Sequence, residues 1–498
     1  MKVVLINPPM LGLAGDPFGS IPFMPVGLLS VAAFLRSRGV EIAVIDGYGE
    51  APTRMRFSGP YMISGLTLAQ VVERIPADVD LVGISVLAGA SHRLALGLIR
   101  RLKSRLPGIA VMVGGPHAAV LPEPFLHGGA DFVVPGEGEK AAWNICRFID
   151  GQIAALEPEH GALHARLPGV SPQPATDLDS LPHPAFDLIP RQNYWKLGVA
   201  HAPFRARYHP MVTSRGCPFQ CAFCSTPLLS GQQWRGRTAR RVVQEMEEVY
   251  RRDGVRDFFF QDDNFAVDRG RVGDICSLIR ERGLDVSIHL PSGVTANLLD
   301  EEIVRHMGRS GFHSICLAPE SGSTQVIRRM KKPVDLQHLE RVMQWLREAR
   351  IRTNAFIMVG YEGETREEFR QTRALVRKLT RLGVDEFSVF IYTPLPGARP
   401  PADPSLMQYE NYEDLCWSPR WRPDYAQCRR KRMTLYGEFF LWKAAFHPLE
   451  LARSWLRVIT GRYETKGEMA FRRSLPMWGR LLAHRLSGKE NNVSVDNS

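Results

Sequence analysis

Three cysteines near the middle of the chain have the spacing of metal ligands. Cys217, Cys221 and Cys224 lie in the stretch Thr213-Ser-Arg-Gly-Cys-Pro-Phe-Gln-Cys-Ala-Phe-Cys, separated by three and then two residues. This spacing lets one loop wrap a compact metal centre. Zinc sites usually close with four ligands, and no fourth Cys or His follows nearby, whereas a 4Fe-4S cluster held by three thiolates leaves one iron open to a small molecule. The pattern predicts a 4Fe-4S centre, and the alternatives are a zinc knuckle and cysteines that cluster by chance.

The segments around this loop alternate between strand and helix patterns. Strands are expected at residues 211–214, 257–261, 286–290, 313–317, 353–359 and 386–392, and helices at 238–252, 268–282, 299–309, 334–349 and 364–381. Because the pattern ends near Pro400, it predicts a partial (β/α)6 TIM-like barrel over residues 205–400, and not a full barrel of eight units. The cysteine loop follows the first strand, at the carboxyl end where barrel active sites form.

The cysteine motif resembles the signature of a known family. Cys-x3-Cys-x2-Cys with an aromatic residue just before the third cysteine is similar to the motif of radical S-adenosylmethionine (radical SAM) enzymes, and Cys217, Cys221, Phe223 and Cys224 match it position by position. The resemblance implies a 4Fe-4S cluster whose unique iron binds the amino and carboxylate groups of S-adenosylmethionine. It also implies reductive cleavage of that cofactor to a 5′-deoxyadenosyl radical.

The same resemblance assigns three later strand ends to S-adenosylmethionine. Asp262 and Asp263 stand where the methionine ammonium group is expected, although relatives often have Gly-Gly-Glu there. Glu320 and Ser321, in Pro-Glu-Ser-Gly-Ser, suit ribose hydroxyl groups, and Gly360 lets the backbone approach an adenine. The alternative for each is an ordinary helix cap or turn.

The first 150 residues also alternate strand and helix patterns, which predicts a doubly wound, Rossmann-like parallel sheet. Ser85 and Leu87 at one strand end, and Gly114 and Gly115 at the next, resemble the Ser-x-Leu and Gly-Gly parts of cobalamin-binding domains. In that family, small residues make room for the nucleotide tail of the corrinoid. The alternative is a degenerate domain that binds no corrinoid.

One departure from the cobalamin pattern concerns the cobalt ligand. Many such domains carry Asp-x-His-x-x-Gly after the first strand, but residues 7–16 contain no histidine. The cobalt would then lack a protein imidazole from this motif. His117 is expected to be a surface loop histidine and not a substitute ligand.

The positive charge of the chain gathers near its end. The 498 residues carry a net charge of +11, and residues 420–490 alone hold 16 Lys and Arg against 6 Asp and Glu, a net of +10. Residues 151–204 are expected to be a linker with local structure, and residues 401–498 a basic, aromatic, helical region with a disordered tail. A basic amphipathic helix suits an anionic membrane surface. The alternatives are a helical cap on the barrel and, less expected, RNA binding.

Composition indicates an ordinary globular protein, with 44% hydrophobic and 23% charged residues. The eight cysteines are too scattered for a secreted disulfide framework. Neither a signal peptide nor an apolar run of 18 residues is visible. We therefore expect a cytoplasmic protein, with peripheral contact at the inner face of the membrane as an option.

The leading hypothesis for function is a radical SAM enzyme that uses cobalamin to methylate an unactivated carbon of an apolar or natural-product-like substrate. The alternative is a radical oxidative cyclase or ring-rearranging enzyme of tetrapyrrole or isoprenoid-lipid biosynthesis. Two remote alternatives are a tRNA methylthiotransferase, which needs three more cysteines in an N-terminal domain that has only Cys146, and a non-catalytic Fe-S or corrinoid binding module. The expected partners are a small substrate, lipids included, and an electron donor such as flavodoxin or ferredoxin, without nucleic acid. No catalytic base can be named.

Overall fold

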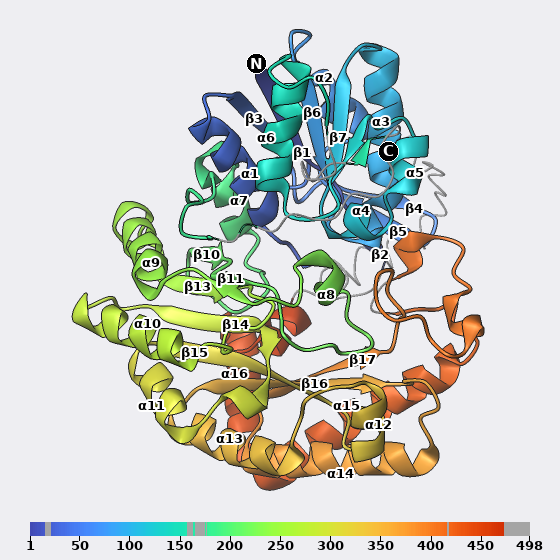
Figure 1. The fold of residues 1–498 in the computed structure, drawn as a ribbon. Coiled ribbons are helices and arrows are strands. Elements are labelled where there is room, and N and C mark those ends of the chain that lie inside the picture. Colours follow the sequence, from blue (N-terminus) through green and yellow to red (C-terminus); the bar gives the residue numbers. More distant parts are fainter. Residues whose placement is uncertain (15–20, 157–162, 165–174, 176, 416–417, 473–498) are drawn as a thin grey trace.

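The computed structural model describes residues 1–14, 21–156, 163–164, 175, 177–415 and 418–472 (Figure 1). Two α/β units, each built on a parallel sheet, are stacked so that the N-terminal unit covers one end of the second (Figure 1). The expected disordered tail lies outside the described residues.

The N-terminal sheet has the strand order β3-β1-β6-β7-β8-β9, parallel except for the last pair. The strands are β1 (Lys2–Asn7), β3 (Glu41–Asp46), β6 (Leu81–Ser85), β7 (Ala110–Gly114), β8 (Phe132–Val133) and β9 (Leu163–His164). The helices are α1 (Val26–Ser37), α2 (Leu68–Glu73), α3 (His92–Arg105), α4 (Pro116–Val120), α5 (Glu123–His127) and α6 (Gly138–Ile149). Alternate residues of β1 enter two different cores: Val4 packs with residues of α2 and α3, and Val3 packs with residues of α1 and α6. Helices on both faces confirm the doubly wound fold.

One feature of this unit was not foreseen from the sequence. A three-stranded antiparallel sheet of β2 (Met10–Leu13), β4 (Met55–Ser58) and β5 (Tyr61–Ser64) lies beside the parallel one. The region expected to be a linker with local structure is partly folded. It contributes β9 and α7 (Arg191–Lys196), and the buried Tyr194 hydroxyl donates a hydrogen bond of 2.9 Å to Asp46. The connection is thus packed against the N-terminal unit.

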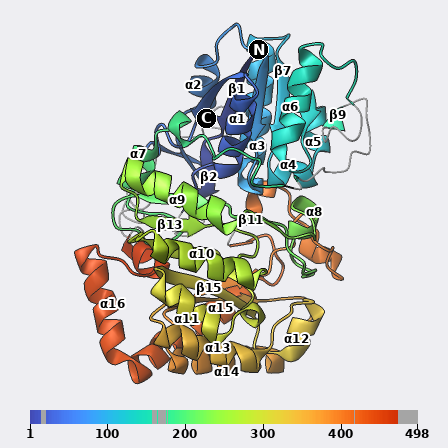
Figure 2. The ribbon, with the colours of Figure 1, turned by 60° about the vertical axis from the view of Figure 1, so that its left-hand side comes forward.

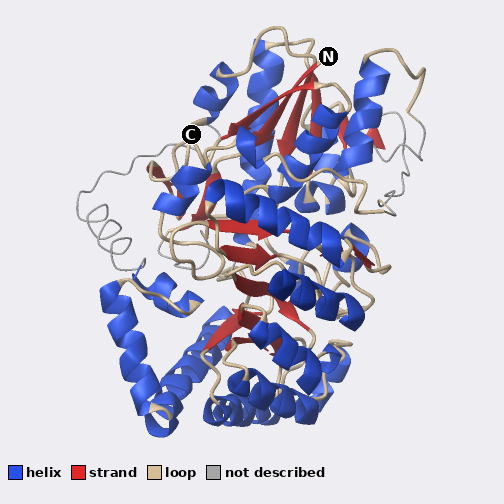
Figure 3. Ribbon diagram, turned by 90° about the vertical axis from the view of Figure 1, so that its left-hand side faces the viewer, coloured by secondary structure: helices blue, strands red, loops and turns tan. Residues whose placement is uncertain are grey.

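The second sheet has the order β10-β13-β14-β15-β16-β17, and every pair is parallel. The strands are β10 (Tyr208–Met211), β13 (Asp257–Phe260), β14 (Ser287–Val294), β15 (Phe312–Glu320), β16 (Arg352–Val359) and β17 (Glu386–Ile391). The helices α9 (Ala239–Asp253), α10 (Arg269–Glu281), α11 (Glu301–Arg309), α12 (Thr324–Arg329), α13 (Leu336–Glu348) and α14 (Arg366–Leu382) complete the series. Helices line the outer side of the curved sheet (Figure 3). The partial (β/α)6 barrel is confirmed.

The C-terminal region contains the helices α15 (Tyr425–Phe446) and α16 (Pro448–Thr460). α15 packs against α14 and β17, and its Leu435 and Phe439 join the barrel core. α16 turns back at His447 and projects from the body of the barrel (Figure 2). α15 is therefore a helical cap on the barrel, whereas α16 is mostly exposed. Within the described ranges, no helix is long and apolar enough to cross a membrane.

Candidate active site

The cysteine loop leaves the carboxyl end of β10 as a closed excursion. β11 (Ser214–Arg215) pairs antiparallel with β12 (Arg235–Gly236), which brings both ends of the loop together. Gly216 opens the loop with a φ of 85°, and a Cβ there would lie 2.4 Å from the Gln233 carbonyl oxygen, so glycine is required. α8 (Thr226–Leu229) follows the third cysteine and contacts α4 of the N-terminal unit. The loop is thereby held between the two units.

The three cysteines suit a cluster. All are half-buried free thiols. Burial raises the pKa of Cys217, and it raises the pKa of Cys221 to about 11, so the thiolates need a cationic partner such as iron. Over the described ranges, no three His, Cys, Asp or Glu side chains gather as ligands of one metal ion. In a 4Fe-4S cluster each cysteine binds a different iron, so three separated thiols on one loop fit that group.

Asp262 and Asp263 follow β13 but face different surroundings. Asp262 is buried and accepts hydrogen bonds from the Thr213 amide (2.6 Å), the Thr213 hydroxyl (2.5 Å) and the Ser214 hydroxyl (2.7 Å). Burial raises its pKa, against the opposing charge of Arg271. Asp263 is exposed and accepts a hydrogen bond of 2.9 Å from the Gly216 amide. Asp262 therefore braces the strand before the cysteine loop, and Asp263 is the carboxylate that remains accessible beside it.

Glu320 ends β15 in a left-handed conformation, with a φ of 63°. This conformation is unfavourable for a residue with a side chain, and such strain clusters at functional sites. Its carboxylate lies 3.3 Å from the ammonium group of Lys332, which in turn lies 5.6 Å from the ring centre of Phe223. Lys332 thus links two of the predicted site residues, although no sequence motif had marked it.

Ser321 and Gly360 contact the protein itself. The Ser321 side chain is fully buried, and its oxygen lies 3.1 Å from the Thr372 hydroxyl. Gly360 has a φ of 72°, and a Cβ there would lie 2.4 Å from the Cys428 sulfur in α15. The small size of Gly360 therefore makes room for Cys428 of the capping helix α15.

A cavity of about 510 Å³ lies between the N-terminal sheet and the barrel. All four residues expected to hold cobalamin line it: Ser85, Leu87, Gly114 and Gly115. A Cβ at Gly114 would meet only Val134, at 3.7 Å, so the glycine leaves open space. Leu87 is 57% exposed. A wall of small and apolar residues fits a large macrocycle.

The barrel contributes to the same cavity. Seven residues of the barrel unit line it: Val212, Ser214, Arg215, Leu229, Ser230, Gln261 and Asp263. Predicted cobalamin residues and a predicted S-adenosylmethionine residue therefore share one chamber.

An ion-pair network joins the two units at the edge of this chamber. Arg215, two residues before Cys217, pairs with Glu137 (2.9 Å) and Glu139 (2.5 Å) of the N-terminal unit. Arg235 of β12 also pairs with Glu137, at 2.6 Å. Burial alone would raise the pKa of Glu137, but the hydrogen bond from Arg235 and the charge of Arg215 hold it below its usual value. The network ties the cysteine loop to the floor of the cavity.

His117 differs from the expectation. It is buried, not on the surface, and its Nε2 lies 3.0 Å from His92 Nδ1. Burial lowers the pKa of both imidazoles to about 4. His117 is absent from the described lining of the cavity.

Two family models match the chain. The Radical SAM superfamily matches residues 211–397, and the B12 binding domain matches residues 22–145. An uncharacterized methyltransferase of Pyrococcus horikoshii is 29% identical, over 85% of this chain and 86% of its own length. The anaerobic magnesium-protoporphyrin IX monomethyl ester cyclase of Rubrivivax gelatinosus is 24% identical, over 89% and 78%.

A solved structure shares the fold. The radical S-adenosylmethionine methyltransferase TsrM from Kitasatospora setae, with cobalamin and a [4Fe-4S] cluster bound, superposes with a TM-score of 0.62. The match covers 83% of this chain and 84% of TsrM at 16% identity.

Proposed function

The chain belongs to the radical SAM enzymes that carry a cobalamin-binding domain, and on this premise we propose that it methylates an unactivated carbon of an apolar substrate. The single observation that carries the proposal is the shared chamber of about 510 Å³ between the two units. A methyl donor on one wall and a hydrogen-abstracting group on the other must both reach one substrate carbon. A chamber lined by both units meets that requirement.

The chain's own residues have distinct tasks in this proposal. Cys217, Cys221 and Cys224 hold the 4Fe-4S cluster, and Gly114 and Leu87 border the corrinoid. When bound, the cluster supplies reductive cleavage of S-adenosylmethionine, and cobalamin supplies methyl transfer.

The remaining predicted residues bind S-adenosylmethionine or support that binding. Asp263 and Glu320 bind its polar groups beside Phe223. Asp262, Ser321 and Gly360 support the site indirectly, because they contact other parts of the chain. Arg215 holds the cysteine loop at a fixed distance from the corrinoid wall through Glu137 and Glu139.

The first test is cofactor retention. The protein is reconstituted anaerobically with iron, sulfide and hydroxocobalamin, and metals are measured after gel filtration. We expect one corrinoid per chain in the native protein and a large loss in Gly114→Val, with iron unchanged. A matched control is Gly108→Val, at an open turn where an added Cβ meets nothing within 4 Å. Iron without cobalt in the native protein would refute the cobalamin assignment.

The second candidate function is oxidative cyclisation, which the cyclase relatives favour. The products of S-adenosylmethionine distinguish the two reactions. Methyl transfer from S-adenosylmethionine leaves S-adenosylhomocysteine in addition to 5′-deoxyadenosine, whereas cyclisation leaves only 5′-deoxyadenosine. Chromatography of a reaction with dithionite and candidate apolar substrates decides between them.

Two partners complete the proposal. We propose that flavodoxin or ferredoxin reduces the cluster, and that the basic C-terminal region brings the enzyme to an anionic membrane surface. The net charge of +10 over residues 420–490 supports the second part.

A further inference from the structure

Helix α16 has its apolar face turned outward. Five exposed side chains form this face, here called the apolar stripe: Leu449, Ala452, Trp455, Leu456 and Ile459. Leu449 and Ile459 are 72% and 69% exposed, and Leu456 is 59% exposed. An ordinary surface helix buries such a face. Contiguous apolar patches of this kind mark surfaces that contact a partner or a membrane.

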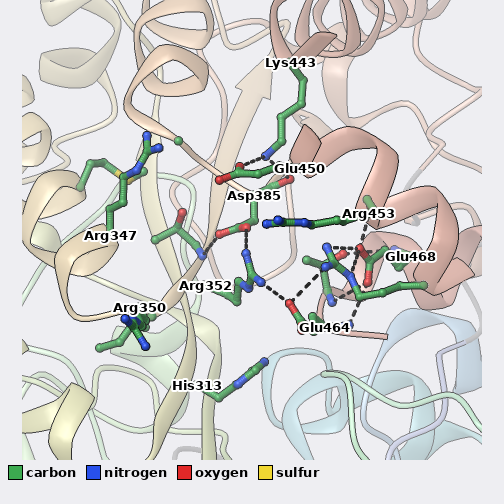
Figure 4. A pocket seen from close by; sticks show the side chains of 17 residues that line it. His313, Arg347, Arg350, Arg352, Asp385, Lys443, Glu450, Arg453, Glu464 and Glu468 are labelled. Atoms are coloured by element: carbon green, nitrogen blue, oxygen red, sulfur yellow. Dashed lines mark hydrogen bonds and ion pairs between the residues drawn. The ribbon is translucent and has the colours of Figure 1, made fainter. Parts of the chain in front are cut away.

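The polar face of α16 is turned inward, where it borders a cavity of about 490 Å³ (Figure 4). The cavity lies at the amino ends of β15, β16 and β17, away from the chamber between the two units. Glu450 and Arg457 face it from α16, and Lys443 faces it from α15. The orientation of α16 is thus the reverse of the usual one: its charged side chains line a polar cavity inside the protein, and its apolar side chains face solvent.

Basic side chains outnumber carboxylates in this cavity by six to four. The basic residues are Arg347, Arg350, Arg352, Lys443, Arg453 and Arg457, and the carboxylates are Asp385, Glu450, Glu464 and Glu468. Arg352 pairs with Asp385 (2.9 Å), and Arg457 pairs with Glu464 (3.4 Å) and Glu468 (2.9 Å). Lys443 pairs with Glu450 at 3.8 Å, so all four carboxylates are neutralised within the protein.

Two guanidinium groups have no such partner. Within the part of the chain that the structure describes, no hydrogen bond or ion pair is made by the side chains of Arg350 and Arg453. Figure 4 shows Arg453 extending across the cavity without a contact to the carboxylates on either side. Both side chains are exposed to solvent, so the cavity offers two guanidinium groups to an anion.

Arg453 also borders the apolar stripe. Residues 449, 453 and 456 of a helix fall within about 60° of one another, because successive residues are 100° apart. The mouth of the cavity at Arg453 therefore adjoins Leu449 and Leu456. A cationic, anion-binding site beside an apolar surface matches one ligand chemistry, a phosphate group that carries acyl chains.

We propose that α16 docks on an anionic phospholipid bilayer, with the apolar stripe in the interface and a lipid phosphate in the cavity at Arg350 and Arg453. This inference rests on the proposed membrane contact and specifies its site. Amphipathic helices bury their apolar face at the headgroup boundary, and each nearby basic residue adds to binding on anionic lipid.

The test is flotation of the full-length, cluster-reconstituted protein with phosphatidylcholine vesicles, with and without phosphatidylglycerol. We expect binding only when phosphatidylglycerol is present. Arg453→Gln weakens partitioning about fivefold, and Leu456→Gln weakens it about tenfold. The matched controls are Arg462→Gln, outside the cavity, and Met433→Gln, at a side chain 57% exposed on α15. Both controls change partitioning less than twofold.

Each contrary result identifies a different error. Equal binding to both vesicle types, or equal effects of Arg453→Gln and Arg462→Gln, overturns the headgroup site. Calorimetric binding of inorganic pyrophosphate that Arg453→Gln abolishes, with vesicle binding unchanged, assigns the cavity to a soluble phosphate. Dimerisation without vesicles that Leu456→Gln abolishes assigns the stripe to a second copy of the chain. Flotation needs no turnover, so failure here leaves the methyl-transfer proposal intact.

Discussion

The two walls of the central chamber differ in how their predicted binding residues are used. On the cobalamin side, all four predicted residues line one cavity. On the S-adenosylmethionine side, Asp262, Ser321 and Gly360 contact the protein itself, while Asp263 and Glu320 stay near the cysteine loop. A polar or small residue at a strand end has two kinds of partner available, a ligand or a neighbouring element. Sequence position alone does not choose between them.

The largest expected effect separates the two neighbouring aspartates. Asp262→Ala removes a buried carboxylate that accepts three hydrogen bonds and whose charge contributes most to stabilising the Arg271 guanidinium, so we expect a loss of about 3–5 kcal/mol in the free energy of unfolding. Asp263→Ala is expected to cost less than about 1 kcal/mol and to weaken S-adenosylmethionine binding instead. Urea unfolding and equilibrium dialysis measure the two quantities. Equal stability of the two variants would contradict the assignment of Asp262 as a brace.

Two glycines provide the next comparison. Gly360→Ala places a Cβ against Cys428 at a left-handed φ, and we expect a loss of about 2–4 kcal/mol in unfolding free energy. Gly114→Ala meets only Val134, at van der Waals distance. It should leave stability within about 0.5 kcal/mol and weaken corrinoid binding about tenfold. Thermal unfolding and spectroscopic titration with hydroxocobalamin test the pair. A destabilised Gly114→Ala variant would contradict the assignment of Gly114 to the open cavity wall.

Glu137→Gln breaks the link between the walls. Loss of its charge should cost about 1–2 kcal/mol. Because the folded pKa of Glu137 lies below its usual 4.5, this stabilisation is complete above pH 4.5 and is lost as the pH falls through the lower folded value. The melting temperatures of the native protein and the variant should therefore converge in acid. A difference that stays constant with pH would show that the charge of Glu137 is not responsible.

The smallest expected effect compares two serines. Ser321→Ala removes the buried hydroxyl that accepts a hydrogen bond from the Ser323 amide and contacts the Thr372 hydroxyl, and we expect a cost of about 1 kcal/mol. Ser85→Ala, at the cavity wall, should leave stability unchanged and alter corrinoid affinity less than threefold. Denaturant midpoints resolve the first change, and titration resolves the second. A larger effect of Ser85→Ala on stability would place that hydroxyl among the internal contacts.

Much of the fold follows from local patterns. The six barrel strands and the five longer helices between them were expected within a few residues, because buried parallel strands are continuous apolar runs and amphipathic helices repeat every 3.6 residues. The short helices α8 and α12 were not expected. The antiparallel sheet of β2, β4 and β5 was missed because its strands are four residues long. Such short segments carry little periodic signal. Lys332 was missed for another reason, since only the folded chain brings it to Glu320.

The sequence by itself determined the cysteine spacing, the order of strands and helices, and the basic character of the C-terminal region, because each is set by residue types close together along the chain. The tertiary structure decided which strand-end residues face the chamber and which are used internally. It also decided that Arg215 ties the two units together, and that α16 presents its apolar face outward. These depend on contacts between residues far apart in the chain, and no local pattern records them.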